Sequence, residues 1–207
     1  MRTPHFLFSA LSMVAGVVAT TGCGGGSGSS DVTVTILSTQ AVDGMVTDGG
    51  AVFPTFDLQV GDTITNNSKR GFLRFSHAAI PVGTTIVAAT LRVHQSIVFS
   101  TPYTAFGDVF VDHIDIGALL DASDFASVAI LTNFGILSSD ATLGYKSLDV
   151  TGRVVADVAA ARLNSDFRLH TLIFTDSDSF EDSSHWDDGE DSFASGNVPQ
   201  LFVTYTP

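Results

Sequence analysis

Hydrophobic and polar residues alternate along several short segments of the chain. The clearest segments are VTVTIL at 32–37, GFLRF at 71–75, TTIVAATLRVHQ at 84–95, GDVFVDHI at 107–114, RLHTLIF at 168–174 and LFVTY at 201–205. A repeat of two places successive side chains on opposite faces of a β-strand. In GFLRF, Leu73 and Phe75 share one face, while Phe72 and Arg74 share the other. The segments therefore predict strands that each have one side facing a core.

One segment has a helical repeat instead. In residues 149–163, Val150, Val154 and Val158 recur every four positions, and Asp149 is a suitable capping residue. Elsewhere Val, Ile, Thr and Phe dominate between turns rich in Gly, Asp, Asn and Ser. We therefore predict an all-β fold: an antiparallel two-sheet β-sandwich of the jelly-roll type with one short helix. A closed barrel is the alternative that the pattern leaves open.

The first thirty residues predict export. Residues 1–22 begin with a positive charge, continue through an apolar run and end directly before Cys23. The apolar run is too short to cross a bilayer. A small residue followed by cysteine resembles the lipobox of bacterial lipoproteins, which implies a signal peptide at 1–22, lipidation of Cys23 and display at the outer membrane or cell surface. Residues 23–30 form a Gly/Ser tether, and 31–207 have the size of a single domain.

Charge narrows the range of partners. The formal net charge is −13 at pH 7. Nucleic-acid affinity depends largely on Lys and Arg that neutralise phosphates, so this composition argues against a nucleic-acid partner. A basic membrane-binding face is equally disfavoured, and we expect contact with the membrane through the lipid anchor only. Cys23 is the only cysteine, which excludes an intramolecular disulfide.

An ordered set of motifs supports a more specific assignment. They are FLRF at 72–75, IPVGTTI at 80–86, ATLRV at 89–93, DVTGRVVADV at 149–158, FRLHTLIF at 167–174 and VPQLFVTY at 198–205. This set resembles DNRLRE-type domains and the related family 96 carbohydrate-binding modules, over most of residues 40–206. The resemblance implies a jelly-roll β-sandwich on secreted or surface proteins. It also implies polysaccharide binding, with acidic polysaccharide as the ligand of some members.

Three arginines lie in the middle of predicted strands: Arg74, Arg92 and Arg168. If these strands are neighbours, the side chains make a basic patch. Such a patch suits the carboxylates of a uronate polymer, because guanidinium grips carboxylate with two hydrogen bonds. The alternative is that the arginines pair with Asp166 or Asp112 as cross-strand ion pairs.

Two aromatic residues are candidate stacking platforms for sugar rings. Trp186, the only tryptophan, lies in a strongly polar segment, where a tryptophan rarely serves only to fill a core. Tyr103 is the second candidate. Sugar rings bury their apolar C–H surface against flat aromatic faces. The alternative is that both rings pack against the sandwich.

The segment DSDSFEDSSHWDDGEDS at 176–192 holds eight of the twenty-two acidic residues. Ca²⁺ takes six to eight oxygen ligands, and the run offers many carboxylates. No EF-hand register fits and the nonapeptide calcium repeat is absent, so a site would combine the run with distant carbonyls. The candidate ligands are Asp176, Asp178, Asp182, Asp188, Glu190 and Asp191. The alternative is a solvated acidic loop with Asx turns.

Motifs of catalysis are missing from the sequence. It has no GxSxG elbow, no cysteine in the folded part and no phosphate-binding Gly loop. Carboxylate pairs occur in any Asp-rich chain and therefore indicate nothing about glycoside hydrolysis. The sequence favours a non-catalytic, lipid-anchored module that binds polysaccharide. The alternative is a structural or adhesive surface module that binds a protein partner or another copy of itself.

Overall fold

The computed structural model describes residues 30–190 and 195–207. The strands are β1 (Val32–Leu37), β2 (Gly44–Thr47), β3 (Val52–Pro54), β4 (Leu58–Asp62), β5 (Ser68–Ser76), β6 (Thr85–Phe99), β7 (Val109–Ile114), β8 (Leu131–Ser138), β9 (Gly144–Asp149), β10 (Asn164–His170), β11 (Ser183–Trp186) and β12 (Gln200–Thr206). The helices are α1 (Pro102–Ala105) and α2 (Thr151–Ala159), with 3-10 turns η1 (His77–Ala79) and η2 (Ala122–Ala126).

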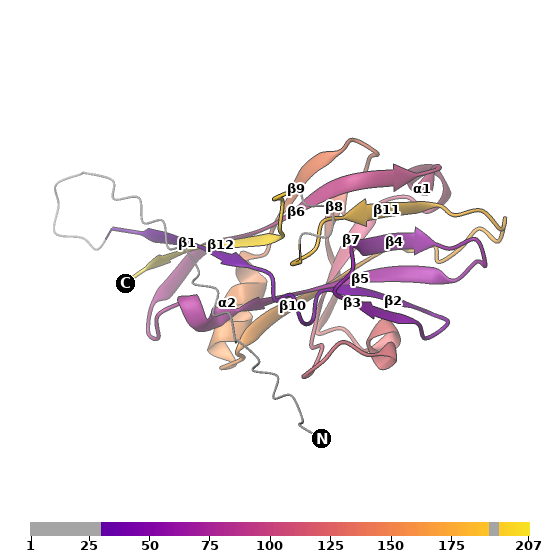
Figure 1. Ribbon diagram of the computed structural model, residues 1–207. Coiled ribbons are helices and arrows are strands. Elements are labelled where there is room, and N and C mark those ends of the chain that lie inside the picture. Colours follow the sequence, from indigo (N-terminus) through magenta and orange to yellow (C-terminus); the bar gives the residue numbers. More distant parts are fainter. Residues whose placement is uncertain (1–29, 191–194) are drawn as a thin grey trace, which may run out of the picture.

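The strands of the described residues form one antiparallel sheet. Its order is β1-β12-β6-β11-β4-β5-β10-β7-β8, with β9 paired to β6, and β2 paired to β3 and β5. Figure 1 shows how the sheet curls: β6 and β9 lie along its upper side, and β2, β3 and β5 along its lower side. The all-β, antiparallel prediction is confirmed. The pairing itself is continuous, so it does not divide the strands into the two separate sheets of the predicted sandwich.

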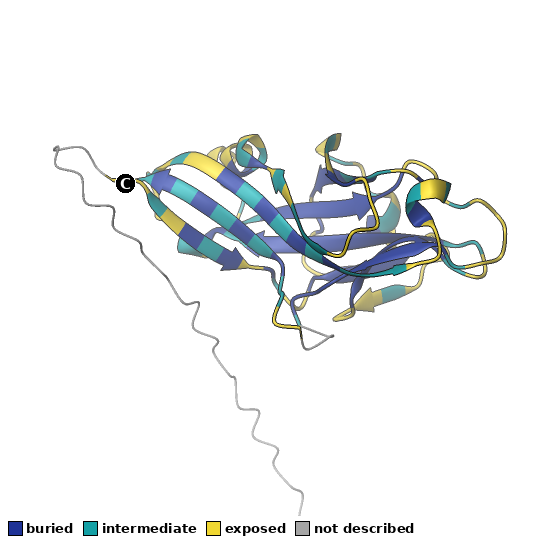
Figure 2. Ribbon diagram, turned by 90° about the horizontal axis from the view of Figure 1, so that it is seen from above, coloured by how far each residue is buried: buried dark blue, intermediate teal, exposed yellow. Residues whose placement is uncertain are grey.

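The long strand β6 connects the two parts of this sheet. One of its edges pairs with β12 and then with β11, and β9 lies on the other edge. Leu91 and Val93 on β6 are fully buried, while Arg92 and His94, which alternate with them, are half-buried, as the alternation predicts. Figure 2 shows the same alternation of buried and partly exposed positions along the strands.

Two hydrophobic clusters lie on opposite faces of β5. Leu73 and Phe75 belong to the main core between the curled halves of the sheet. Phe72 belongs to a smaller cluster with residues such as Val46 and Ile114, on the other face. The predicted division of GFLRF into two faces is therefore confirmed, but both faces are buried.

The predicted helix is present as α2. Asp149 Oδ1 accepts hydrogen bonds from the backbone N–H of Thr151 at 2.9 Å and from its hydroxyl at 2.6 Å, which satisfies one free donor of the first turn. Val150 and Val154 are buried, whereas Val158 is 37% exposed. The helix packs on β6 and β10 and covers one end of the core.

The strand predicted at 168–174 is displaced towards the N-terminus. It runs over Asn164–His170, and Leu172, Ile173 and Phe174 are exposed in the loop that follows. The apolar residues therefore continue beyond the end of β10, and the alternation in the sequence does not show where the strand ends. None of the helices in the described part of the chain has the length and apolar character needed to span a membrane. Cys23, the predicted lipidation site, lies outside the described residues.

Gly61 in β4 occupies a position that only glycine fits. Its φ is +130°, and a Cβ there would lie 2.0 Å from the carbonyl oxygen of Asp182 and 2.8 Å from Cα of Ser183.

We expect Gly61→Ala to lower the unfolding free energy by more than about 2 kcal/mol, because the backbone of the neighbouring strand must move to admit the added Cβ. Gly83→Ala is the control, since its φ is +87° with no atom within 4 Å of the added Cβ. It should cost about 1 kcal/mol. Equal losses in chemical denaturation would contradict the close approach of β4 and β11.

Candidate functional site

Arg74 is held in a bidentate ion pair inside the protein. Arg74 on β5 lies directly opposite Asp166 on β10. Its Nε and Nη2 donate to the two carboxylate oxygens of Asp166 at 2.8 and 2.7 Å. Asp166 also accepts a hydrogen bond from the backbone N–H of Ile116 at 3.0 Å. The pairing raises the pKa of Arg74, because the adjacent carboxylate stabilises the charged guanidinium.

Arg168 makes a second buried pair one strand further along. It lies opposite Asp112 on β7, and its Nε and Nη2 donate to Oδ2 of Asp112 at 3.0 and 2.6 Å. Its Nη1 donates to backbone carbonyls in and just after η2. Oδ1 of Asp112 accepts from the backbone N–H of Asn133 and from Nε2 of His170. The polar atoms of this pair are therefore well satisfied, as buried charges require.

These contacts determine what the two arginines can do. Arg74 is 8% exposed and Arg168 is 5% exposed. The segment that contains η2 covers Arg168 and contributes carbonyl acceptors to it. Their partners, Asp166 and Asp112, are the aspartates that the sequence offers as the alternative to a basic ligand-binding patch. Both pairs are buried and do not lie on the solvent-exposed side of a sheet. Neither guanidinium is presented to solvent.

Arg92 differs from the other two arginines. Its guanidinium lies 3.6 Å from the ring centroid of Tyr145 on β9, and the side chain is half-exposed. Within the described residues it forms no ion pair. The hydroxyl of Tyr145 donates to Oδ1 of Asn197 at 3.1 Å, and His94 meets the Tyr145 ring edge-on with centroids 5.0 Å apart. This stack holds the guanidinium and the ring side by side.

The stack lies on the outer face of the β1-β12-β6-β9 part of the sheet. The registers place Arg92 beside Gln200 of β12 and Ser147 of β9. Phe202 lies on the neighbouring position of β12, next to Thr90. Outward-facing residues of these strands are half-exposed or exposed. Their inward neighbours are buried on β12 and on the middle of β1 and β6, and half-buried on β9. We call this surface the Arg92 face. It consists of Thr33, Thr35, Leu37, Thr90, Arg92, His94, Tyr145, Ser147, Asp149, Gln200, Phe202 and Thr204.

The two predicted stacking platforms lie elsewhere. Trp186 is part of β11, fully buried in the main core, and its Nε1 donates to Oγ of Ser184 at 3.1 Å. Tyr103 lies in α1 with its ring against the core, and its hydroxyl bonds to Gln95 and Ser138. Burial raises the pKa of this hydroxyl. Trp186 therefore presents no open surface to a sugar, whereas Tyr103 is half-buried at the edge of the core.

The acidic run divides into separate groups. Oxygen atoms of Asp176, Asp178 and Asp182 lie within 4.8 Å of one another. Asp188 and Glu190 are outside this group of three and lie near the buried Asp43 instead. Burial and then the charge of Asp188 raise the pKa of Glu190 to about 7. Asp191 lies outside the described residues.

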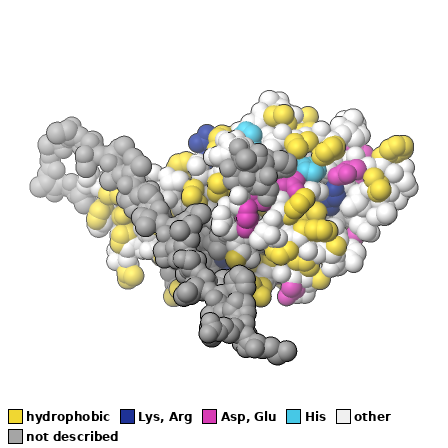
Figure 3. Space-filling model, in the orientation of Figure 1, with side chains coloured by type: hydrophobic (Ala, Val, Ile, Leu, Met, Phe, Trp, Pro, Cys, Tyr) yellow, Lys and Arg dark blue, Asp and Glu magenta, His cyan; other side chains and the backbone are white. Residues whose placement is uncertain are grey.

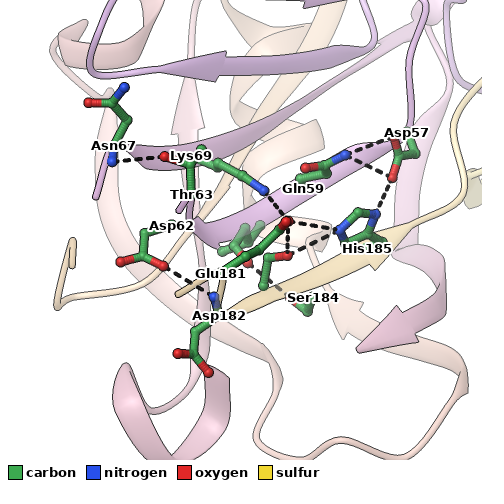
Figure 4. A network of polar contacts seen from close by, with 12 residues as sticks. Asp57, Gln59, Asp62, Thr63, Asn67, Lys69, Glu181, Asp182, Ser184 and His185 are labelled. Atoms are coloured by element: carbon green, nitrogen blue, oxygen red, sulfur yellow. Dashed lines mark hydrogen bonds and ion pairs between the residues drawn. The ribbon is translucent and has the colours of Figure 1, made fainter. Parts of the chain in front are cut away.

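A polar network surrounds the start of β11 and joins it to β4 and β5. Figure 4 shows Lys69 of β5 bonded to Glu181, and His185 bonded to Asp57 through Nδ1. Gln59 also donates to the carboxylate of Asp57. These side chains come from three segments, at the starts of β4 and β11 and in β5, so the network fixes the entry of the acidic run into the sheet. Of the acidic residues of the run, Glu181 is the one whose charge this network compensates.

One buried constellation has the residue types of a nucleophile and its base. Oγ of Ser165 lies 2.9 Å from Nε2 of His77 and 2.7 Å from Oδ2 of Asp157, which also contacts Nε2 of His113 at 2.8 Å. Ser165 is fully buried. A substrate has no path to this hydroxyl in the structure, and the network joins α2 to β7, β10 and η1. Sequence reasoning missed it because its members are far apart in the chain.

No protein-family model matches the chain. No curated protein shows significant similarity to it.

The buried pair of Arg168 and Asp112 is open to a direct test. We expect Asp112→Asn to lower the unfolding free energy at pH 7 by about 3–5 kcal/mol, because it leaves the Arg168 charge buried without a counter-ion. The control is Asp115→Asn, which removes the partner of Arg162 in an exposed pair and should produce no resolvable change. Similar losses in the two variants, measured by denaturant titration, would contradict a structural role for the buried pair.

Acid titration tests the same carboxylate. Burial acts to raise the pKa of Asp112, but hydrogen bonds from His170, the Asn133 amide and Arg168 outweigh it and bring the pKa to about 2. The unfolded value is 3.8, so the unfolded state takes up this proton first. The stability due to Asp112 is present above pH 4 and is lost as the pH falls towards 2. We expect a series of denaturation curves from pH 5 to 2 to show a smaller loss in Asp112→Asn than in the wild type. An unchanged pH dependence would rule out this assignment.

Proposed function

We propose that the protein is a non-catalytic polysaccharide-binding module and that the Arg92 face is its binding surface. The observation that carries the proposal is the stack of Arg92 on Tyr145. Of the three mid-strand arginines, Arg92 is half-exposed and has no carboxylate partner within the described residues, whereas Arg74 and Arg168 are engaged inside the protein. A free guanidinium beside an aromatic ring suits a ligand that has both carboxylates and apolar ring faces.

The shape and polarity of the Arg92 face fit an extended polymer better than a small enclosed ligand. It is a sheet surface whose outward side chains are mostly hydroxyl, amide and aromatic groups. Hydroxyl and amide side chains can exchange hydrogen bonds with sugar hydroxyls, and the rings of Tyr145 and Phe202 offer flat apolar contact. Binding of this kind is shallow and leaves most of the polymer in solvent.

The net charge of −13 does not prevent an acidic polymer from binding. The Debye length is about 8 Å at physiological ionic strength, so only charges near the contact matter. Figure 3 shows acidic side chains at several separate places on the face in view, among hydrophobic and polar ones. Binding of a uronate polymer then depends on the local guanidinium more than on the total charge.

We further propose that the fold is a variant of the jelly-roll β-sandwich found in DNRLRE-type domains and family 96 carbohydrate-binding modules. The ordered motifs at 72–75, 80–86 and 89–93 support this relationship. Lipidation of Cys23 would anchor the module at the outer membrane or cell surface, and the 23–30 tether would hold it away from the bilayer. Polysaccharide in the cell envelope or matrix is then within reach.

A structural or adhesive role is the second candidate. It is favoured by β8, which ends the strand order of the sheet and carries exposed apolar side chains at Leu131 and Ile136. An open edge strand offers unpaired backbone groups to a strand of another chain. Self-association in light scattering that is abolished by Ile136→Lys, with no retention on any polysaccharide, would favour this role.

Substitutions on the Arg92 face test the proposed binding function. We expect the wild-type protein to be retarded in affinity electrophoresis through a polyuronate gel, and Arg92→Gln to weaken binding by about tenfold or more. Tyr145→Ala should also weaken it, because the stacking surface is lost.

The matched control is Arg153→Gln, which removes the same charge from α2. It should bind as the wild type does. Equal binding by all variants, or no retardation by polyuronate and by neutral polymers, would refute the Arg92 face as a polysaccharide site.

A further inference from the structure

Three carboxylates of the acidic run converge, and no Lys, Arg or His in the described part of the chain pairs with them. Asp176 and Asp178 come from the loop between β10 and β11, and Asp182 lies directly before β11. One carboxylate oxygen of each lies within 4.8 Å of the others. None of the three has a Lys, Arg or His partner among the ion pairs of the described residues. Three like charges at this separation repel one another unless a cation lies between them.

A fourth carboxylate provides independent support for a ligand at this place. Asp62 at the end of β4 is fully buried, and its Oδ2 has no hydrogen-bond partner. Its Oδ1 accepts from the backbone N–H of Asp182 at 3.2 Å, the contact drawn in Figure 4, so Asp62 lies directly beside this member of the group. Asp176 and Asp182 are its charged neighbours, and the side chain of Thr175 is a hydrogen-bonding neighbour. A buried carboxylate oxygen without a partner is costly, which indicates a missing ligand.

All four carboxylates are oriented by the backbone in the same manner. Oδ1 of Asp176 accepts from the N–H of Asp178, and Oδ1 of Asp178 accepts from the N–H of Phe180. Oδ1 of Asp182 accepts from the N–H of Thr101 at 2.6 Å. Oδ1 of Asp62 is used in the same way, and its buried Oδ2 makes no hydrogen bond within the described residues. Three converging carboxylates, with Asp62 beside them, are thus available to one ion.

We infer that Asp176, Asp178 and Asp182, with Asp62 beside them, form a Ca²⁺ site. Oxygen ligands from carboxylates are those of a hard cation, and the absence of Cys and His from the group disfavours zinc. Ca²⁺ accepts irregular geometry and completes six to eight ligands with carbonyls or water. Mg²⁺ requires near-ideal octahedral geometry and retains its own water, so it fits less well.

The ion would connect two loops that already lie side by side. Oδ1 of Asn66, in the turn between β4 and β5, accepts from the N–H of Ser179 at 3.0 Å. The N–H of Asp62 donates to the carbonyl of Asp182 at 2.9 Å. Ca²⁺ bound between these segments would cross-link the β4 end to the long loop before β11. The site is independent of the Arg92 face, so it concerns stability and not the proposed sugar contact.

The test measures Ca²⁺ binding and its effect on stability with the purified protein. We expect isothermal titration calorimetry to show one Ca²⁺ per chain. The melting temperature should rise by several degrees in excess Ca²⁺ relative to EDTA, and less in Mg²⁺, because an ion that binds only the folded state stabilises it.

Asp178→Asn separates a metal ligand from a structural residue. Asn retains the Oδ1 acceptor for the Phe180 amide but removes the charge. The variant should therefore melt no lower than wild type in EDTA, yet lose most of the Ca²⁺-dependent rise. Asp48→Asn, in the exposed turn between β2 and β3, is the control and should keep the full rise. Absence of Ca²⁺ binding by the wild type, or equal Ca²⁺ responses in the two variants, would overturn the site.

Discussion

The ion pairs between β5, β10 and β7 are the constraint on which the rest of the structure depends. Arg74 and Asp166 face each other in register, as do Arg168 and Asp112, and all four side chains are buried. A shift of one residue between these strands would place charged groups in the main core and apolar groups among the ions. Because an unpaired buried charge costs several kcal/mol, the pairs disfavour every other register. They also require the η2 segment to close over them and supply carbonyls.

This arrangement explains why the arginines of β5 and β10 are not exposed to solvent. A strand that carries alternating polar residues normally has one solvated side. Here the polar side of β5 and β10 is covered, and its charges are satisfied within the protein. The outward face of β1, β12, β6 and β9 has no such cover, and Arg92 is left with an aromatic neighbour in place of a carboxylate. Arg74 and Arg168 are buried in ion pairs, whereas Arg92 is half-exposed. This difference supports the proposal that the polysaccharide contacts β6.

Much of the fold follows from local pattern, and the remainder depends on distant partners. The β1 segment, most of β6 and β12, and the helix after Asp149 could be predicted, because alternation and capping are local properties. The burial of Arg168 could not, since it depends on carbonyls and on an aspartate 56 residues away. The acidic sequence neighbours of Trp186 indicate a polar loop. Trp186 is buried because β11 is inserted between β4 and β6. Asp62 carried no sequence signal, being 120 residues from its partner Asp182.

The acidic run serves more than one purpose in this structure. Its first part gathers carboxylates beside Asp62, its middle forms β11 in the core, and Glu190 near its end lies by the buried Asp43.

The most direct measurement of the proposed function is a titration of ¹⁵N-labelled protein with a soluble uronate oligosaccharide, followed by amide chemical shifts. Binding at the Arg92 face predicts saturable shifts concentrated on β6, β9 and β12. Shifts confined to β5, β10 and the acidic run, or no shifts at millimolar ligand, would contradict it.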